Sequence, residues 1–134
     1  MVRRDFQNLS VSRVREAKIL AAAGCYDGAY YLGGVAVECA LKSTIARATQ
    51  RYEFPNLERT RRAYTHNLET LLYLAGLAAE LDLAAPYVRD AWTLAKGWNV
   101  EARYQIGREV VDVLEFLNAV AGRQGVLPWL RRYW

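Results

Sequence analysis

The chain is poor in the residues that build metal centres and disulfide scaffolds. Its 134 residues include one histidine, two cysteines and three prolines. A single histidine and two cysteines far apart in the sequence are too few for a zinc site within one chain. The sequence also has no glycine-rich phosphate loop between a strand and a helix, and no Gly-x-Ser-x-Gly elbow. We therefore expect neither a bound metal nor a cofactor.

Long hydrophobic runs are missing as well, and we expect no signal peptide. The longest apolar stretch covers residues 28–37 and is followed at once by Glu38 and Lys42, whereas a membrane-spanning helix needs about 20 apolar residues. Arg3 and Arg4 are not followed by the apolar run of a signal peptide. We expect a soluble cytoplasmic protein that makes no contact with membranes.

The two thiols, Cys25 and Cys39, are placed too far apart for a disulfide. Most of the stretch between them is predicted to be helical, which at about 1.5 Å per residue separates them by about 20 Å. A disulfide spans no more than about 7 Å between Cα atoms. Two separate thiols agree with a reducing compartment.

Apolar and helix-forming residues make up most of what is present. Hydrophobic residues are 53% and charged residues 24% of the chain, which is ordinary for a globular protein, and the length fits one domain over residues 1–134. The net charge, 18 − 14 = +4, permits an acidic partner or a nucleic acid without requiring either.

Apolar residues recur at helical spacing throughout, and no alternating strand pattern persists. This pattern predicts an all-α protein, an up-and-down bundle of four or five helices. The expected helices cover about residues 5–23, 27–51, 65–79, 86–97 and 108–121, followed by an aromatic and basic tail at 126–134. Asp5 and Thr65 are the expected N-caps of the first and third helices.

The second predicted helix is apolar on all sides, as is typical of a helix at the centre of a bundle. It contains Gly33 and Gly34, which each cost about 1 kcal/mol of helix propensity relative to alanine. We expect a neighbouring helix to approach closely there. In the last predicted helix the expected inward residues are Val110, Leu114, Leu117 and Ala121. Trp129 and Trp134 of the tail must either pack back or meet a partner.

His66 and Arg61 are the first candidates for chemistry, in the pattern Arg-x4-His. A histidine can act as acid or base in phosphodiester cleavage while an arginine stabilises the charge on phosphorus. We expect His66 to lie at a helix N-terminus, which favours a neutral imidazole. The alternative is a partly exposed histidine beside solvated arginines.

Glu38 and Lys42 are four residues apart on the apolar second helix. They form either an ordinary surface pair worth a few tenths of a kcal/mol or a polar contact in a buried pocket. Arg103 and Tyr104 lie at a predicted bend and are suited to binding phosphate or stacking on a base. The alternative for Arg103 is a structural contact with the second helix through Glu38.

Several segments resemble the HEPN domain family of small helical proteins, and the resemblance covers nearly the whole chain. The segments are Glu16-Ala-Lys-x-Leu20, Gly24-x-Tyr26-x-Gly-Ala29-x-Tyr-Leu32, Ala36-Val-Glu38-Cys-Ala40-Leu-Lys42, Thr65-His66-Asn67-Leu68-Glu69-x-Leu71, Ala102-Arg103-Tyr104 and Gly125-Val-Leu-Pro-Trp129. The third segment is fairly specific, and the others are weaker taken singly. The last resembles the ending of short, single-domain members.

The resemblance implies a helical bundle that dimerises and acts beside a minimal nucleotidyltransferase in a two-gene toxin–antitoxin or defence module. In this reading Glu38, Lys42, Arg103 and Tyr104 bind a nucleotide, RNA or the partner enzyme. Many family members are metal-independent RNases with an Arg-x(4–6)-His motif, which makes Arg61 and His66 the catalytic pair of an alternative function. A structural dimerisation module without a ligand is the third alternative.

Overall fold

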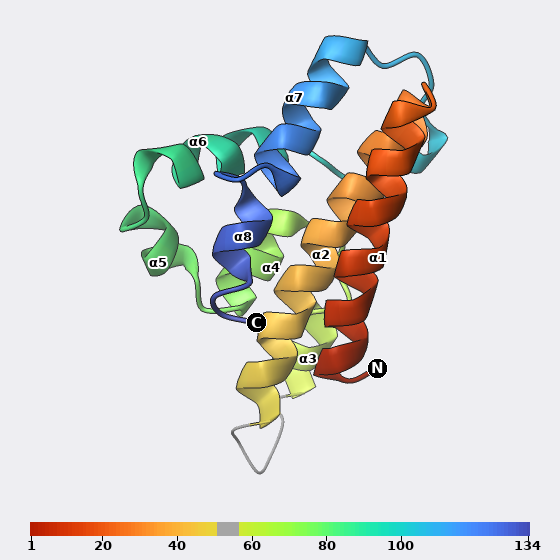
Figure 1. Ribbon diagram of the computed structural model, residues 1–134. Coiled ribbons are helices and arrows are strands. Elements are labelled where there is room, and N and C mark those ends of the chain that lie inside the picture. The colour runs from red at the N-terminus through yellow and green to blue at the C-terminus, as the bar shows by residue number, and fades with distance from the viewer. Residues whose placement is uncertain (51–56) are drawn as a thin grey trace.

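The computed structural model describes residues 1–50 and 57–134, and helices are the only regular elements in those ranges. The prediction of an all-α chain is confirmed. The two longest helices, α1 (Arg3–Ala22) and α2 (Tyr26–Gln50), lie side by side as an antiparallel hairpin (Figure 1). Gly24 turns the chain between them with φ +81°, a conformation that glycine adopts without a side-chain clash.

The expected N-cap of the first helix is wrong by three residues. Val2 occupies the N-cap position, and Asp5 lies within the first turn of α1. The Asp5 carboxylate accepts a hydrogen bond from the Val2 backbone N–H at 2.9 Å. An acidic side chain in the first turn can reach back to a free amide and also interact favourably with the helix dipole. Asp5 therefore supports the start of α1 from inside the helix.

Helix α2 runs unbroken through its paired glycines and forms the centre of the molecule, in contact with α1, α4, α7, α8 and the 3-10 helix η1. A Cβ atom at Gly34 would lie 2.1 Å from the Trp98 indole, and one at Gly33 would lie 2.8 Å from a Leu117 methyl. The expected close approach is thus present at both glycines. The last residue of the predicted helix, Arg51, lies outside the described residues.

The third predicted helix is wrong as a single element. Two short helices, α4 (Leu68–Leu74) and α5 (Ala78–Asp82), take its place, and another, α3 (Leu57–Arg62), precedes it where no helix is expected. Gly76, with φ +74°, ends the regular path between α4 and α5. Helix α4 begins later than expected because Asn67, not Thr65, is its N-cap, with the Asn67 side chain accepting a hydrogen bond from the Thr70 N–H at 2.9 Å.

The fourth predicted helix is confirmed as α6 (Pro86–Ala95), with proline in its first turn. Its buried residues, Val88, Ala91, Trp92 and Ala95, lie at helical spacing on one face. The predicted bend after it contains η1 (Val100–Tyr104). Trp98, which precedes η1, is only 2% exposed because its ring lies against the backbone of α2 at Gly34.

The face that the last long helix, α7 (Val110–Ala121), presents to the core matches the expected one in part, since Leu117 and Ala121 pack against the core as predicted. Val110 is 41% and Leu114 is 49% exposed, so their inward placement is wrong. The buried residues are Val113, Phe116, Ala119 and Val120. The apolar residues of this helix occupy more than one face, and the sequence pattern alone does not show which of them meets α2.

The tail packs back onto the domain. It forms α8 (Val126–Leu130), which contacts α2, α6 and α7. Trp129 is 5% exposed, and Trp134 is partly buried. Arg3 and Gln7 of α1 both donate hydrogen bonds to the Trp134 carbonyl oxygen, at 2.5 and 2.8 Å. Of the two outcomes expected for the tryptophans, packing within the chain is the one observed.

Both thiols are free, with Cys25 exposed and Cys39 buried, as the predicted separation requires. Among the described helices, none combines the length and the apolar character that crossing a membrane requires.

Candidate functional site

A polar cluster interrupts the buried side of α2 one turn after Gly34. Its centre is Glu38, whose side chain is 8% exposed. The Lys42 ammonium, 17% exposed, lies 3.0 Å from Glu38 Oε1 and donates a hydrogen bond to it. A buried carboxylate is costly unless it is paired and hydrogen-bonded, so the partners of Glu38 determine whether it can remain charged. The pair is therefore more buried than an ordinary surface contact.

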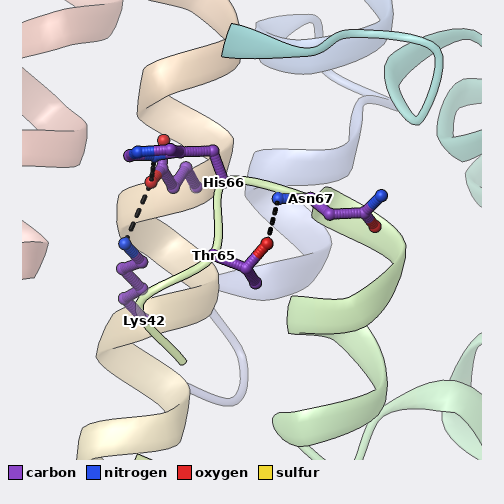
Figure 2. Close-up of polar contacts among 5 residues, drawn as sticks. Lys42, Thr65, His66 and Asn67 are labelled. Carbon is purple, nitrogen blue, oxygen red and sulfur yellow. Dashed lines mark hydrogen bonds and ion pairs between the residues drawn. The ribbon is translucent and has the colours of Figure 1, made fainter. Parts of the chain in front are cut away.

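His66 is the second partner of Glu38, although 28 residues separate them in the sequence. Its Nδ1 atom lies 2.5 Å from Glu38 Oε1, the same oxygen that Lys42 contacts. Figure 2 shows the imidazole reaching α2 from the connector between α3 and α4, with Lys42 directly below the carboxylate. Two predicted site groups, from α2 and from the connector, thus meet in one cluster.

The connector that carries His66 is held by short-range hydrogen bonds. The Asn67 backbone N–H donates to Thr65 Oγ1 at 3.1 Å (Figure 2). The Asn67 side chain caps α4, whose first residue, Leu68, is 1% exposed. The chain on both sides of His66 is thereby fixed, and the ring is directed at α2 without being buried itself.

This placement corrects the electrostatic expectation for His66. The residue precedes the N-cap of α4, so it does not lie in the helical turn whose amides would disfavour an imidazolium. Its nearest charged partner is the Glu38 carboxylate. Because an ionised carboxylate can only accept, the hydrogen bond places the ring proton on Nδ1. The other ring nitrogen, Nε2, remains for a ligand on a side chain that is 50% exposed.

Arg61 lies at the end of α3 and is exposed. In the described part of the chain, no hydrogen bond or ion pair joins Arg61 to His66 or to Glu38. The Arg-x4-His spacing therefore brings the two residues to the same connector region, and their pairing in catalysis stays a prediction.

Arg103 and Tyr104 form a separate pair on η1. The Arg103 guanidinium lies 4.8 Å from the centre of the Tyr104 ring, and Tyr104 is 72% exposed. Among the described residues, Glu38 is bonded to Lys42 and His66 and not to Arg103. The structural alternative for Arg103, a contact through Glu38, is therefore wrong. The arginine and tyrosine instead form an exposed planar pair.

Sequence reasoning missed a contact at the other end of α2. Asp27 accepts hydrogen bonds from the backbone N–H groups of Gly107 and Arg108, at 2.9 and 3.0 Å. These two bonds lower the pKa of Asp27 below 3.8. The Arg108 guanidinium lies 3.6 Å from the centre of the Tyr30 ring. Burial raises the pKa of Tyr30, against the opposing effect of this cation.

No local signal in the sequence pairs Asp27 with residues 80 positions later. An acidic residue in the first turn of a helix is expected simply because it interacts favourably with the helix dipole. The sequence pattern therefore gives no sign that Asp27 also accepts hydrogen bonds from Gly107 and Arg108.

Within the described ranges, no group of three or more histidine, cysteine, aspartate or glutamate side chains could hold a metal ion. No family model matches the chain, and searches of curated proteins and of solved structures return no match. The argument for a function therefore depends on the geometry of the cluster Glu38, Lys42 and His66, together with the sequence resemblance.

Proposed function

We propose that the chain is a HEPN-like protein that binds a phosphate-bearing ligand, a nucleotide or an RNA, at the cluster Glu38, Lys42 and His66. One observation carries the proposal: a buried carboxylate holds an ammonium and a half-exposed imidazole on the same oxygen. Such an arrangement fixes an ammonium donor beside an imidazole whose Nε2 also donates when the ring is protonated, on an otherwise apolar helix.

The donor inventory supports a phosphate ligand. An ammonium group has three N–H donors, and one of them is used by Glu38. The ring of His66 leaves Nε2 free of Glu38, and this nitrogen donates to a phosphate oxygen when the imidazole is protonated. Arg61 and Arg62, exposed at the end of α3, add two positive charges on the same connector. Charge-assisted hydrogen bonds from such groups are the strong contacts that phosphate oxygens make with proteins.

The proposed biological setting follows from the resemblance. The chain would form a homodimer and act with a minimal nucleotidyltransferase in a two-gene toxin–antitoxin or defence module. Arg103 and Tyr104 provide an exposed cation and ring for contact with the ligand or with that enzyme. Co-purification with the product of an adjacent nucleotidyltransferase gene, and its loss in Arg103→Ala, would support this setting. If Arg103→Ala still binds the nucleotidyltransferase, Arg103 does not contribute to that contact.

Ligand binding is tested by fluorescence anisotropy with a labelled single-stranded RNA, followed by competition with adenosine monophosphate and inorganic phosphate. We expect His66→Ala and Lys42→Met each to weaken binding about tenfold, which corresponds to about 1.4 kcal/mol for a lost charge-assisted contact. Lys96→Met is the matched control, because Lys96 forms an exposed 3.4 Å ion pair with Glu69 and not with Glu38. Equal binding by all three variants, or no binding by the wild type, contradicts the proposal.

A second function, metal-independent RNA cleavage, is favoured by one specific contact. The His66 ring is oriented by a carboxylate at Nδ1, and a base oriented by a third group is the usual arrangement for general acid–base catalysis. His66 Nε2 would take the proton of a ribose 2′-hydroxyl as that oxygen attacks the adjacent phosphorus. The bond to the 5′-oxygen then breaks, and the protonated ring returns the proton to that leaving oxygen. Arg61 would stabilise the charge on phosphorus.

Cleavage is tested by incubating purified protein with RNA in the presence of EDTA. The RNase alternative predicts products from the wild type, none from His66→Ala and reduced rates from Glu38→Gln and Arg61→Ala. Products that are equal in His66→Ala would refute it. If neither binding nor cleavage is found, a structural dimerisation module without a ligand becomes the supported function.

A further inference from the structure

A pocket of about 660 Å³ lies beside the cluster, between the N-terminal end of α1, the C-terminal half of α2 and the end of α3. This volume is within the range of about 300–1,000 Å³ that is usual for small-molecule sites. Its lining combines residues that are far apart in the sequence, including Phe6, Ile45 and Tyr64. Lys42 belongs to both the pocket and the polar cluster.

The described lining is mainly apolar. Seven of its ten residues have apolar or aromatic side chains, and Ile45 at its base is 6% exposed. Val2 and Tyr64, by contrast, are 58% and 78% exposed. Large apolar side chains exposed around a concave surface mark a site that another molecule covers. A body of several carbon atoms would bury these side chains.

The charged residues of the lining have one sign. Arg3 and Lys42 are basic, and none of the described lining residues is acidic. Arg3 Nε donates to the Trp134 carbonyl, and Lys42 donates to Glu38. A guanidinium has five N–H donors and an ammonium three, so both groups have donors beyond these two bonds. An anionic group at the edge of the pocket would accept hydrogen bonds from either of them.

We infer that this pocket binds a small organic acid, a molecule with an apolar body and one anionic group. The body lies against Phe6, Ile45 and Tyr64, and the anion lies at Lys42, the lining residue shared with the polar cluster. A nucleobase is a poor fit because its edge needs several donors and acceptors, whereas Thr60 is the one uncharged polar side chain in the described lining apart from the Tyr64 hydroxyl. The inference does not depend on phosphate binding or RNA cleavage.

The test uses decanoate as the probe, with isothermal titration calorimetry on the full chain. Decyltrimethylammonium has a chain of the same length with the opposite charge, and inorganic phosphate has the charge without the chain. We expect decanoate to bind with one molecule per chain and the other two to bind at least tenfold more weakly. No binding of decanoate overturns the inference, and so does equal binding of either comparison compound.

Pocket-filling variants locate the site. Ala46→Phe places a ring inside the pocket and should weaken decanoate binding at least tenfold. If this variant does not fold, Ala63→Phe, which fills the pocket from the residue after α3, replaces it with the same expected effect. Ala79→Phe, at an exposed position of α5, is the matched control and should bind as the wild type does. Undiminished binding by the folded pocket variants overturns the inference.

His66 supplies an independent readout because it is the chain's single histidine. It shares the Glu38 oxygen with Lys42, so an anion at Lys42 should shift the nitrogen resonances of its ring. We expect decanoate to produce this shift in the wild type, and not in the pocket variants at the same concentration. Saturating decanoate that leaves the His66 resonances unchanged would exclude Lys42 as the anion contact and overturn the inference in the form stated.

Discussion

Two consecutive turns of α2 contact the rest of the chain in opposite ways, one through close apolar packing and the other through polar contacts. At Gly33 and Gly34 the helix lacks side chains, and the Trp98 ring and Leu117 fill the space. One turn later Glu38 places a carboxylate in the interior, where Lys42 and His66 both contact one of its oxygens. Close packing requires only that two surfaces match, and it is stabilising by itself. A buried ion pair contributes little net stability compared with an apolar replacement. The contrast fits a glycine turn that serves the fold, and it supports the proposal that the charged turn binds a ligand.

The largest expected effect comes from Gly34→Ala. The added Cβ would lie 2.1 Å from rigid indole atoms of Trp98, so the ring or the helix must move. Overpacking of this kind costs about 1–3 kcal/mol or more. We expect a steric cost of about 3 kcal/mol and a gain in helix propensity of roughly 1 kcal/mol, so the free energy of unfolding should fall by about 2 kcal/mol. Urea unfolding measures the change.

Gly28→Ala is the matched control on the same helix. A Cβ there would meet only a Leu20 methyl at 3.2 Å, at the end of a side chain that can rotate away. Its stability should stay within about 1 kcal/mol of the wild type, because the propensity gain opposes a small steric cost. If both variants unfold at the same urea concentration, the close contact with Trp98 does not limit stability.

Glu38→Ala should have an effect nearly as large. Removing one member of a buried ion pair costs about 3–5 kcal/mol, and the half-exposed His66 and partly exposed Lys42 reduce this to about 2 kcal/mol. The double variant Glu38→Leu/Lys42→Met should recover to within about 1 kcal/mol of the wild type, because an apolar pair replaces the ionic one. The same double variant should not recover ligand binding. Recovery of both properties would contradict a functional role for the cluster.

A smaller effect is expected in the reactivity of the two thiols, because Cys39 is buried beside Glu38 in the charged turn of α2 and Cys25 is exposed. Burial, and secondarily the neighbouring Glu38 charge, raise the pKa of Cys39 to about 11, while Cys25 is exposed. The thiolate is the reactive form, so Ellman's reagent at pH 8 should label one thiol quickly and the second only in denaturant. Cys25→Ser should abolish the fast phase. Fast labelling of both thiols in the native protein would show that this turn of α2 opens.

The sequence predicted the packed turn well and the charged turn in part. Apolar residues on every side of α2 and the two glycines are local signals, and they led directly to a central helix with a close neighbour. They could not name Trp98 as that neighbour, because its approach depends on how η1 returns to α2. The face of α7 was mispredicted for a related reason, since apolar residues such as Val110 and Leu114 lie on its exposed side as well.

The site was predicted as separate candidates, and its assembly was not. Glu38 and Lys42 have a spacing that places them on one helix face, so their contact follows from local geometry. The contact of His66 with Glu38 depends on α3, on the Asn67 cap and on the path of the connector. The sequence pattern predicts none of these, because it indicates a polar stretch followed by a single helix over residues 65–79.

The smallest effect is expected at the start of α2, where Asp27 accepts two backbone hydrogen bonds from the loop at Gly107. Backbone hydrogen bonds from Arg108 and Gly107 lower the pKa of Asp27 below 3.8. A lowered pKa in the folded state means that the stabilisation is complete above pH 3.8 and is lost as the pH falls through the folded value. The difference in unfolding free energy between the wild type and Asp27→Asn should therefore be constant near neutral pH and shrink below pH 3.8. Asp90→Asn, which removes an exposed carboxylate from α6, controls for the loss of one negative charge. A difference that grows on acidification would mean that the loop at Gly107 is not held by the ionised Asp27, and that the end of α2 is stabilised by packing as its middle is.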